Sequence, residues 1–354
     1  MKFKLYKDQC EINDYLDFPM FGINSNYLSP DNRSHYDDYL PEEMRQRFED
    51  IEEALESFKP LIEQFYFRTF SLANICRRIE SIFNYQSIET YIEAIRSYDN
   101  QTFKYKVVQV LLEEVEEANL EEPGLIQKVI DDNHYITYIN KLSDDGKEKW
   151  FLMQLLDNPM GMVETWLGLL TSLNPLYLNY KGLYQGQALD YGEDMIDKLN
   201  ASQGAYLKDL SDGLVDKELI LSGVILVSWV NSLSILLSTN SHPQYMVLGY
   251  QIEAFFENMR LVKEKANLDK ITAFKNLGDK TRYRVLKCVA EGIISTKDIA
   301  EIIGVSSATI SYHINNLVTS RLLHHNKVDG KLKLAVNRSW IDQLILSLKE
   351  DFLQ

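Results

Sequence analysis

One stretch near the end of the chain, STKDIAEIIGVSSATISYHINNL from Ser295 to Leu317, constrains the fold more than any other. Its first part places apolar residues Ile299, Ala300 and Ile303 on one helix face. Gly304 then predicts the helix end, because helices commonly finish in a left-handed residue and glycine adopts that conformation without a steric penalty. Apolar residues recur at i, i+4, i+7 and i+8 in a second helix: Ile310, Ile314, Leu317 and Val318. Two short helices joined by a tight turn are therefore predicted.

Polar residues stand where each of these helices should begin. Thr296 is predicted to cap the first helix and Ser306 the second, because a hydroxyl oxygen can accept a hydrogen bond from an unpaired backbone N–H of the first turn. Asp298 lies in the first turn, where the helix dipole favours a carboxylate.

A hairpin is predicted directly after the second helix. Asp329-Gly330 favours a type I′ turn, and it separates two strand-like segments, His324 to Val328 and Lys331 to Val336. Helix, turn, helix and hairpin together are the layout of a winged helix-turn-helix. In that layout the second helix enters the DNA major groove and the hairpin, or wing, lies beside it.

The outer face of the second helix suits base reading. At 100° per residue, the positions opposite the apolar stripe hold small or hydrogen-bonding side chains, where an acidic side chain would be repelled by phosphate. The glycine turn and the wing favour DNA binding over a merely solvated helix face. The predicted DNA-contacting residues are Thr296, Lys297, Ser307, Ala308, Thr309, Ser311, Tyr312 and Asn315, with Lys327, Lys331 and Lys333 on the wing.

The charge distribution is compatible with DNA binding by this region alone. The chain has a net charge of −15, but residues 271–354 hold 12 Lys and Arg against 8 Asp and Glu. DNA affinity depends on local neutralisation of phosphates, so a basic module on an acidic protein can bind. No Lys or Arg lies between Val305 and Ser320. An alternative therefore stays open, in which the winged helix no longer binds DNA and docks another protein.

The stretch AFKNLGDKTRYRVLKCVAEG, from Ala273 to Gly292, together with the helices and wing, resembles the ArsR-type winged-helix repressor family. Leu277 to Arg282 resembles the opening signature of that family. The resemblance covers only the C-terminal quarter of the chain. It implies a homodimer that binds double-stranded operator DNA and releases it on sensing a signal.

The residues depart from the metal-sensing members of that family. Those members carry Cys-x-Cys before the first helix of the motif, where this chain has Ser295 and Lys297. The other metal site of the family needs His on the final helix, and WIDQLILSLKEDFLQ contains none. We therefore predict no metal site and no cofactor.

The final helix is amphipathic. The resemblance implies that such a helix forms the dimer interface, and packing on the protein's own core is an equal alternative. The residues that share its apolar face are Trp340, Ile341, Leu344, Ile345, Leu348 and Phe352.

The rest of the chain, residues 1–262, predicts a mainly helical body with a few strands. Residues 1–18 are expected to supply an early strand, 27–38 a loop, and Pro41-Glu42-Glu43 a helix start. Helix breaks are expected at Pro60, Pro123-Gly124, Asp144 to Gly146, Asn158-Pro159 and Asn174-Pro175. The fold class is thus mainly α with a small antiparallel β component, a helical body followed by a winged helix-turn-helix at 263–354. The body is expected to sense an unknown small-molecule effector or to set the dimer geometry.

The stretch Leu219 to Ser238 is long and apolar enough for a membrane span, and no charged residue lies between Glu218 and Glu253. Asn231 and five serines within the stretch, with an alternating pattern at Ser232 to Ile235, favour buried antiparallel strands instead. Turns are expected near 229–232 and 240–243. A membrane-tethered regulator remains the alternative.

Catalytic signatures are missing from the sequence. It has no G-x-S-x-G, Walker A, H-E-x-x-H or G-x-G-x-x-G motif, so an enzyme is not expected. Cys10, Cys76 and Cys288 are far apart, and residues 1–14 have no apolar signal segment. The prediction is a cytoplasmic transcriptional regulator, a repressor.

Overall fold

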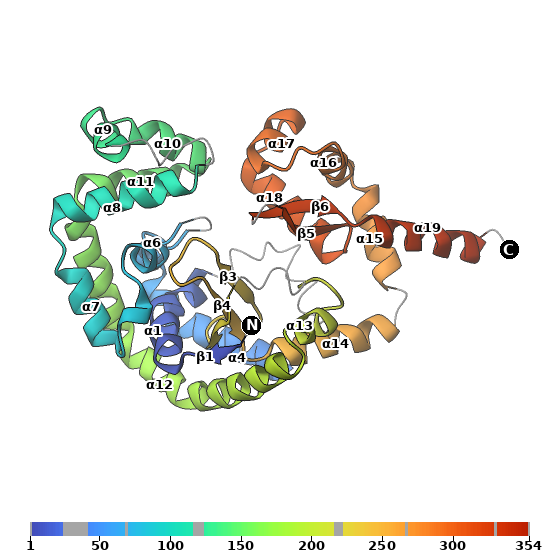
Figure 1. Cartoon of the computed structure of the whole chain (residues 1–354), viewed down its shortest axis with the longest axis horizontal. Coiled ribbons are helices and arrows are strands. Elements are labelled where there is room, and N and C mark those ends of the chain that lie inside the picture. Colours follow the sequence, from blue (N-terminus) through green and yellow to red (C-terminus); the bar gives the residue numbers. More distant parts are fainter. Residues whose placement is uncertain are drawn as a thin grey trace. The chain divides into compact units, whose positions relative to one another are not determined.

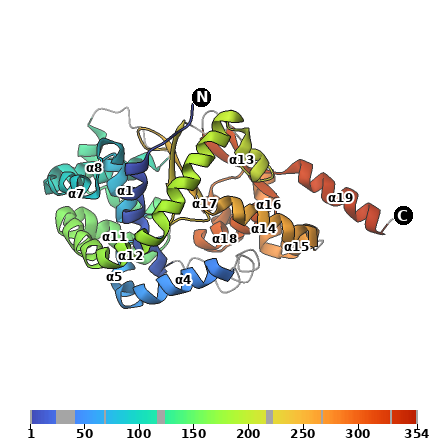
Figure 2. The ribbon, with the colours of Figure 1, turned by 90° about the horizontal axis from the view of Figure 1, so that it is seen from below.

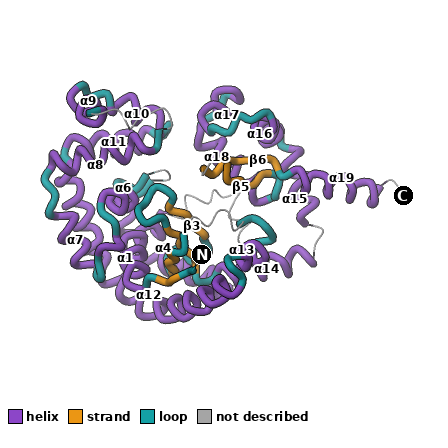
Figure 3. Tube along the Cα trace, viewed as in Figure 1, coloured by secondary structure: helices purple, strands orange, loops and turns teal. Residues whose placement is uncertain are grey.

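The computed structural model describes residues 2–23, 42–67, 70–115, 124–215, 222–265, 268–328 and 331–352. It is mainly helical, with two small sheets (Figures 1 and 3). Its contacts divide the chain into two compact units. The N-terminal unit comprises Met1–Gly204 and Leu221–Asn258, and the C-terminal unit comprises Ala205–Ile220 and Met259–Gln354. The fold class predicted from the sequence is confirmed, while the boundary at residue 262 stays a prediction.

A four-stranded mixed sheet lies within the N-terminal unit. Its strands are β1 (Lys4–Leu5), β2 (Val224–Ser228), β4 (Tyr245–Gly249) and β3 (Ile235–Ser238), in that spatial order. β1 and β2 run parallel, as do β2 and β4, whereas β3 is antiparallel to β4.

The strands and turns predicted in the long apolar stretch are confirmed, and so is the antiparallel pairing of β3 with β4. The expected pairing of β2 with β3 is wrong. The chain passes from β2 through a turn at 229–233 and returns as β3 on the far side of β4, so β2 meets β4 in parallel. Strand pairing depends on the whole fold, whereas a strand pattern is local. None of the helices in the described ranges combines the length and apolar character that crossing a bilayer requires.

The early strand expected at residues 1–18 is wrong apart from β1. The segment forms α1 (Lys7–Asp17), whose residues from Gln9 onward are buried except Glu11. A helix buried on most sides shows no clear apolar stripe in sequence, which explains the error. Figure 2 shows α1 beside α12 (Pro159–Ala201), which contacts it.

Helices make up most of the N-terminal unit. After the short 3₁₀ helix η1 (Phe18–Met20), α4 begins at Glu42 as predicted from Pro41-Glu42-Glu43, and the expected loop at 27–38 lies outside the described residues. The further helices are α4 (Glu42–Leu55), η3 (Glu56–Phe58), α5 (Lys59–Ile62), α6 (Leu72–Ile79), η4 (Ile82–Asn84), α7 (Ile88–Arg96), α8 (Asn100–Glu113), α9 (Leu125–Asp131), α10 (Tyr135–Leu142) and α11 (Gly146–Asp157).

Two predicted helix breaks are confirmed by their caps, because Asp145 and Asn158 accept first-turn N–H groups of α11 and α12. The break at Asn174-Pro175 is wrong, since Pro175 lies inside α12. An internal proline costs roughly 3 kcal/mol. Burial of Leu170, Leu173 and Tyr177 on the same stretch of helix offsets that cost.

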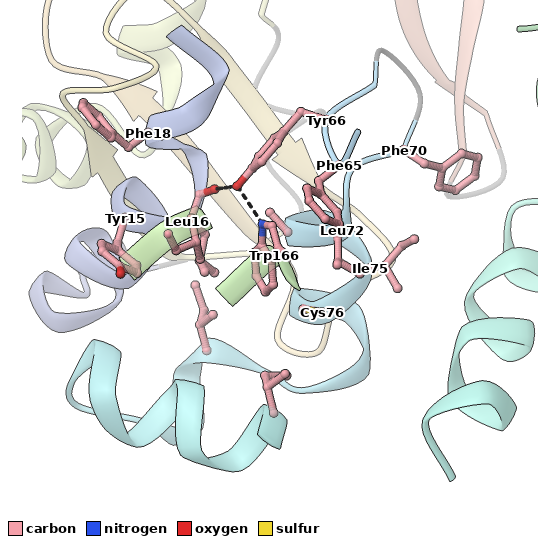
Figure 4. Close-up of a cluster of buried hydrophobic side chains, with 14 of the residues drawn as sticks. Tyr15, Leu16, Phe18, Phe65, Tyr66, Phe70, Leu72, Ile75, Cys76 and Trp166 are labelled. Carbon is pink, nitrogen blue, oxygen red and sulfur yellow. Dashed lines mark hydrogen bonds between the residues drawn. The ribbon is translucent and has the colours of Figure 1, made fainter. Parts of the chain in front are cut away.

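Aromatic side chains fill the core of the N-terminal unit. The Tyr66 hydroxyl donates to the Leu16 carbonyl at 2.7 Å and accepts from Trp166 Nε1 at 3.1 Å, so both buried polar groups are paired (Figure 4). Trp229 is fully buried and stacks with Phe21 and Tyr184.

The C-terminal unit has its own core, built by helices packed on a hairpin. The unit includes α13 (Ala205–Leu210), which the sequence did not connect with it. The elements that follow are α14 (Ile252–Lys265), which runs across the division between the units, then α15 (Leu268–Gly278), α16 (Lys280–Ala290), α17 (Thr296–Ile303), α18 (Ser307–Thr319), β5 (Leu323–Val328), β6 (Lys331–Val336) and α19 (Arg338–Phe352).

Candidate nucleic-acid interface

The first helix of the predicted motif is α17, and its cap lies one residue earlier than predicted. Ser295, not Thr296, is the N-cap, and its hydroxyl accepts from Asp298 N at 3.3 Å. Both residues carry a hydroxyl, so the sequence alone does not decide between them. Gly304 ends the helix at φ 84°, which confirms the left-handed turn. Arg284 of α16 donates to the Ile302 and Ile303 carbonyls at 3.0 and 3.3 Å and so pairs two carbonyl groups at this helix end.

The second helix, α18, buries the predicted stripe. Ser306 caps it by accepting from Thr309 N at 3.1 Å, as predicted. Ile310 and Leu317 are fully buried, Ile314 is nearly so, and Val318 packs against the same core. This burial fixes which face of α18 points outward.

The outward face holds the predicted reading residues. Ala308 and Asn315 are exposed, and Ser307, Thr309, Ser311 and Tyr312 are half-buried. The Ser311 hydroxyl donates to the Ser307 carbonyl at 3.0 Å, and the hydroxyl oxygens of Thr309 and Ser306 lie 2.8 Å apart. Thr296 and Lys297 are exposed at the start of α17. The structure therefore brings this group of predicted residues together on α17 and α18.

Arg282 of α16 joins this surface, and the sequence analysis did not identify it. Its guanidinium lies 5.9 Å from the centre of the Tyr312 ring and donates to Asn276 Oδ1. Asn276 Nδ2 in turn donates to the Asn316 carbonyl of α18 at 3.3 Å. A cation thus lies beside a helix that has none of its own. Arg282 is part of the LGDKTR stretch. That stretch supported the family resemblance, but it did not indicate that this side chain would lie beside α18.

The wing is confirmed as the antiparallel pair β5 and β6, whose register runs from Leu323↔Val336 to Val328↔Lys331. Asp329-Gly330, the predicted turn, lies outside the described residues. The backbones of Lys327 and Lys331 belong to the strands, and their side chains lie outside the described part. Lys333 is half-buried beside Asn326 on the neighbouring strand.

Histidines in this unit do not form a metal-like arrangement. His324 and His325 are successive residues of β5 and point to opposite faces of the wing. His313 is 9 % exposed, and burial lowers its pKa below the usual value while Asp279 opposes the shift. A neutral packing histidine fits these surroundings. Among the described residues there is no group of three or more His, Cys, Asp or Glu that could hold a metal ion.

The final helix, α19, uses only part of its apolar face within the unit. Trp340 Nε1 donates to the Ser320 carbonyl at 3.0 Å, and Leu344 is 3 % exposed. Farther along, Ile345 and Phe352 are 46 % and 77 % exposed. In Figures 1 and 2 α19 extends away from α15 to α18. The first part of α19 therefore packs on the core of its own unit, whereas the later part leaves apolar side chains exposed, as a dimer interface would require.

A family model described as a helix-turn-helix domain matches residues 277–326, from the end of α15 to β5. Searches of curated proteins and of solved structures give no match. The C-terminal unit thus contains a helix-turn-helix domain, and this domain indicates a DNA-binding regulator.

Proposed function

We propose that the protein is a transcriptional repressor that binds operator DNA through α18, with the wing beside it on the sugar-phosphate backbone. The observation that carries the proposal is the outward face of α18, which presents small and hydrogen-bonding side chains while its apolar stripe is buried. A recognition helix needs such a face, because bases are read by hydrogen bonds and small apolar contacts at their edges.

The cations for phosphate contact come from outside α18. Lys297 lies in the first turn of α17, Arg282 lies beside Tyr312, and Lys333 is on the wing. Phosphate contacts position a protein on DNA, whereas base contacts specify the sequence. Cations outside α18 can therefore contact phosphates while α18 contacts the bases.

A homodimer of the ArsR type completes the proposal. The exposed distal residues on the apolar face of α19, Ile345 and Phe352, would be covered by the same helix of a second copy. Two recognition helices could then occupy half-sites one DNA turn apart. The N-terminal unit would sense the effector or set the geometry of the dimer. The absence of enzymatic activity, of a metal and of a cofactor, and the cytoplasmic location, stay predictions.

The experiment is a mobility-shift titration of the full chain against the DNA upstream of its own coding region and against unrelated DNA. Changing Ser311 and Tyr312 to Ala should cost about 1–3 kcal/mol on the operator and relax sequence preference. Changing Lys331 and Lys333 to Ala should weaken binding to every sequence and reduce the salt slope by about 2.

Lys287→Ala is the matched control, because this lysine of α16 is exposed and lies near Glu291 in the same unit. It should leave both quantities unchanged. Equal operator binding by wild type and by both double variants would refute the proposal. If the wild type binds no DNA at low salt, the alternative applies, a winged helix that docks another protein. The lack of Lys and Arg in α18 is the observation that favours that alternative.

A further inference from the structure

A wide groove lies within the C-terminal unit beside the wing, and residues from both faces of the wing line it. In the β5–β6 register, Leu323, Leu334 and Val336 share the core-facing side, so His324, Asn326 and Lys333 share the opposite side. The segment 208–214, which comprises the end of α13 and the turn after it, forms a second wall. Residues 337–339 at the start of α19 form a third. The groove has a volume of about 860 Å³.

The groove is cationic in a chain that is strongly acidic overall. Among the residues that the structure describes, Lys208, Arg321, Lys333 and Arg338 line it, against the single carboxylate of Asp212. The whole chain carries a net charge of −15. Local charge governs which ligand is attracted, so this groove favours anions although the chain as a whole is acidic.

One of these cations is held in place before any ligand arrives. Arg321 has a left-handed backbone, φ 59°, and its side chain is 19 % exposed. Its Nη2 donates to Asp212 at 2.7 Å, and its guanidinium lies 5.7 Å from the centre of the Trp340 ring. Asp212 also accepts from Arg260 Nε at 3.3 Å. Because one carboxylate is shared by two guanidinium groups, the three side chains together retain a net positive charge.

A helix N-terminus opens at the same groove. Asn337 caps α19 by accepting from Trp340 N at 3.2 Å, and residues 337–339 are in the groove wall. Backbone N–H groups at such an end favour phosphate and carboxylate groups. This feature is independent of the side-chain cations and points to the same class of ligand.

We propose that this groove binds a small organic phosphate, with its phosphate groups between Lys208, Lys333 and Arg338. Apolar residues of the wall, among them Leu214, Ile294 and Val336, would contact the carbon part of the ligand. The volume is in the range of sites for molecules of nucleotide size. The site lies on the C-terminal unit, not on the N-terminal unit where an effector was expected.

Binding there should also oppose DNA binding. Lys333 is one of the predicted phosphate contacts of the wing, so a ligand that engages it competes with the DNA backbone. By linkage, DNA should then weaken ligand binding by the same factor. This consequence, unlike the site itself, depends on the proposed function.

The first test is isothermal titration calorimetry of the full chain, without DNA, with sodium pyrophosphate and with ADP as probes. Both should bind the wild type, and the combined variant Lys333→Gln and Arg338→Gln should weaken both at least about tenfold, as expected for lost charge-assisted hydrogen bonds. Lys287→Gln should bind like the wild type. These positions are on the surface, and unchanged thermal unfolding would show that the variants are folded. No pyrophosphate binding up to 10 mM (roughly a 2.7 kcal/mol threshold), or equal binding by the double variant, would overturn the site.

The second test is the mobility shift with and without pyrophosphate, compared with sodium chloride of equal ionic strength. Weaker DNA binding only with pyrophosphate supports competition, and an equal effect of both salts overturns it. If pyrophosphate does not bind but the double variant weakens binding to every DNA, the groove is a DNA-backbone surface and the proposal is wrong. If pyrophosphate binds and the wild type binds no DNA, the site stands and the proposed function fails.

Discussion

Gly304→Ala should destabilise the helix-turn-helix by about 1 kcal/mol. The residue ends α17 at φ 84° and ψ 38°, a conformation that costs an L-residue about 1–2 kcal/mol. A Cβ there would meet no atom within 4 Å, so no clash adds to the backbone term. Replacing glycine also lowers the entropy of the unfolded chain, which returns about 0.4–1 kcal/mol. Gly304→Asn should cost less than Ala, because asparagine tolerates the left-handed region.

Gly278→Ala is the matched control. Gly278 is the last residue of α15, a Cβ there also meets nothing within 4 Å, and its φ is not positive. It should therefore be neutral or stabilise by about 0.4–1 kcal/mol. Hydrogen exchange of the full chain, followed by mass spectrometry on peptides from 296–319, measures the opening free energy of α17 and α18. Equal exchange in the two alanine variants would refute the assignment of the cost to the left-handed turn.

Two further predictions concern the N-terminal unit. Asp14 is fully buried and accepts from Ser228 and Trp229, and burial raises its pKa to about 8. The folded state then holds a proton that the unfolded state releases above about pH 4, so stability falls as the pH rises from there through 8. Asp14→Asn should remove this loss, so the difference in urea-unfolding free energy between wild type and variant should change between pH 5 and pH 9. The same difference at both pH values would contradict the prediction. Arg77 donates to Asp17 at 2.8 Å with both side chains under a tenth exposed. Arg77→Met should cost about 3–5 kcal/mol in the same assay, because it leaves a buried charge unpaired, and adding Asp17→Asn should recover part of that cost. A loss below about 1 kcal/mol would argue against a buried pair.

The helix-turn-helix could be predicted because its signals are local. Gly304, the hydroxyl at Ser306 and the apolar spacing of α18 each act within a few residues, and the structure bears out all three. The wing strands followed from a two-residue turn signal between two strand-like segments, and their residues match the structure closely. The cap error at Thr296 is of the same local kind, since two neighbouring hydroxyls could do the same work.

The N-terminal unit was harder to predict because its structure depends on partners far away in sequence. α1 is buried by α12 and β2, and β2 finds β4 beyond an intervening strand. Pro175 is accommodated because the helix around it is packed against the core. The local sequence around a proline does not reveal such packing. Local propensity was therefore a poor guide wherever tertiary contacts decided the outcome.

The same distinction applies to the site. The outward face of α18 was predictable from spacing, but Arg282, the cation beside Tyr312, comes from another helix. The groove beside the wing depends on a still more remote segment, because Asp212 meets Arg321 across more than a hundred residues of chain. That segment leaves the N-terminal unit after Gly204, and the chain re-enters the unit at Leu221. A winged helix alone would be joined to the N-terminal unit by one chain segment. This C-terminal unit also contains residues 205–220, which come from the middle of the chain. The groove that this segment completes contains both the cationic side chains and the capped N-terminus of α19. A ligand site that regulates the proposed DNA binding is therefore best sought in this groove.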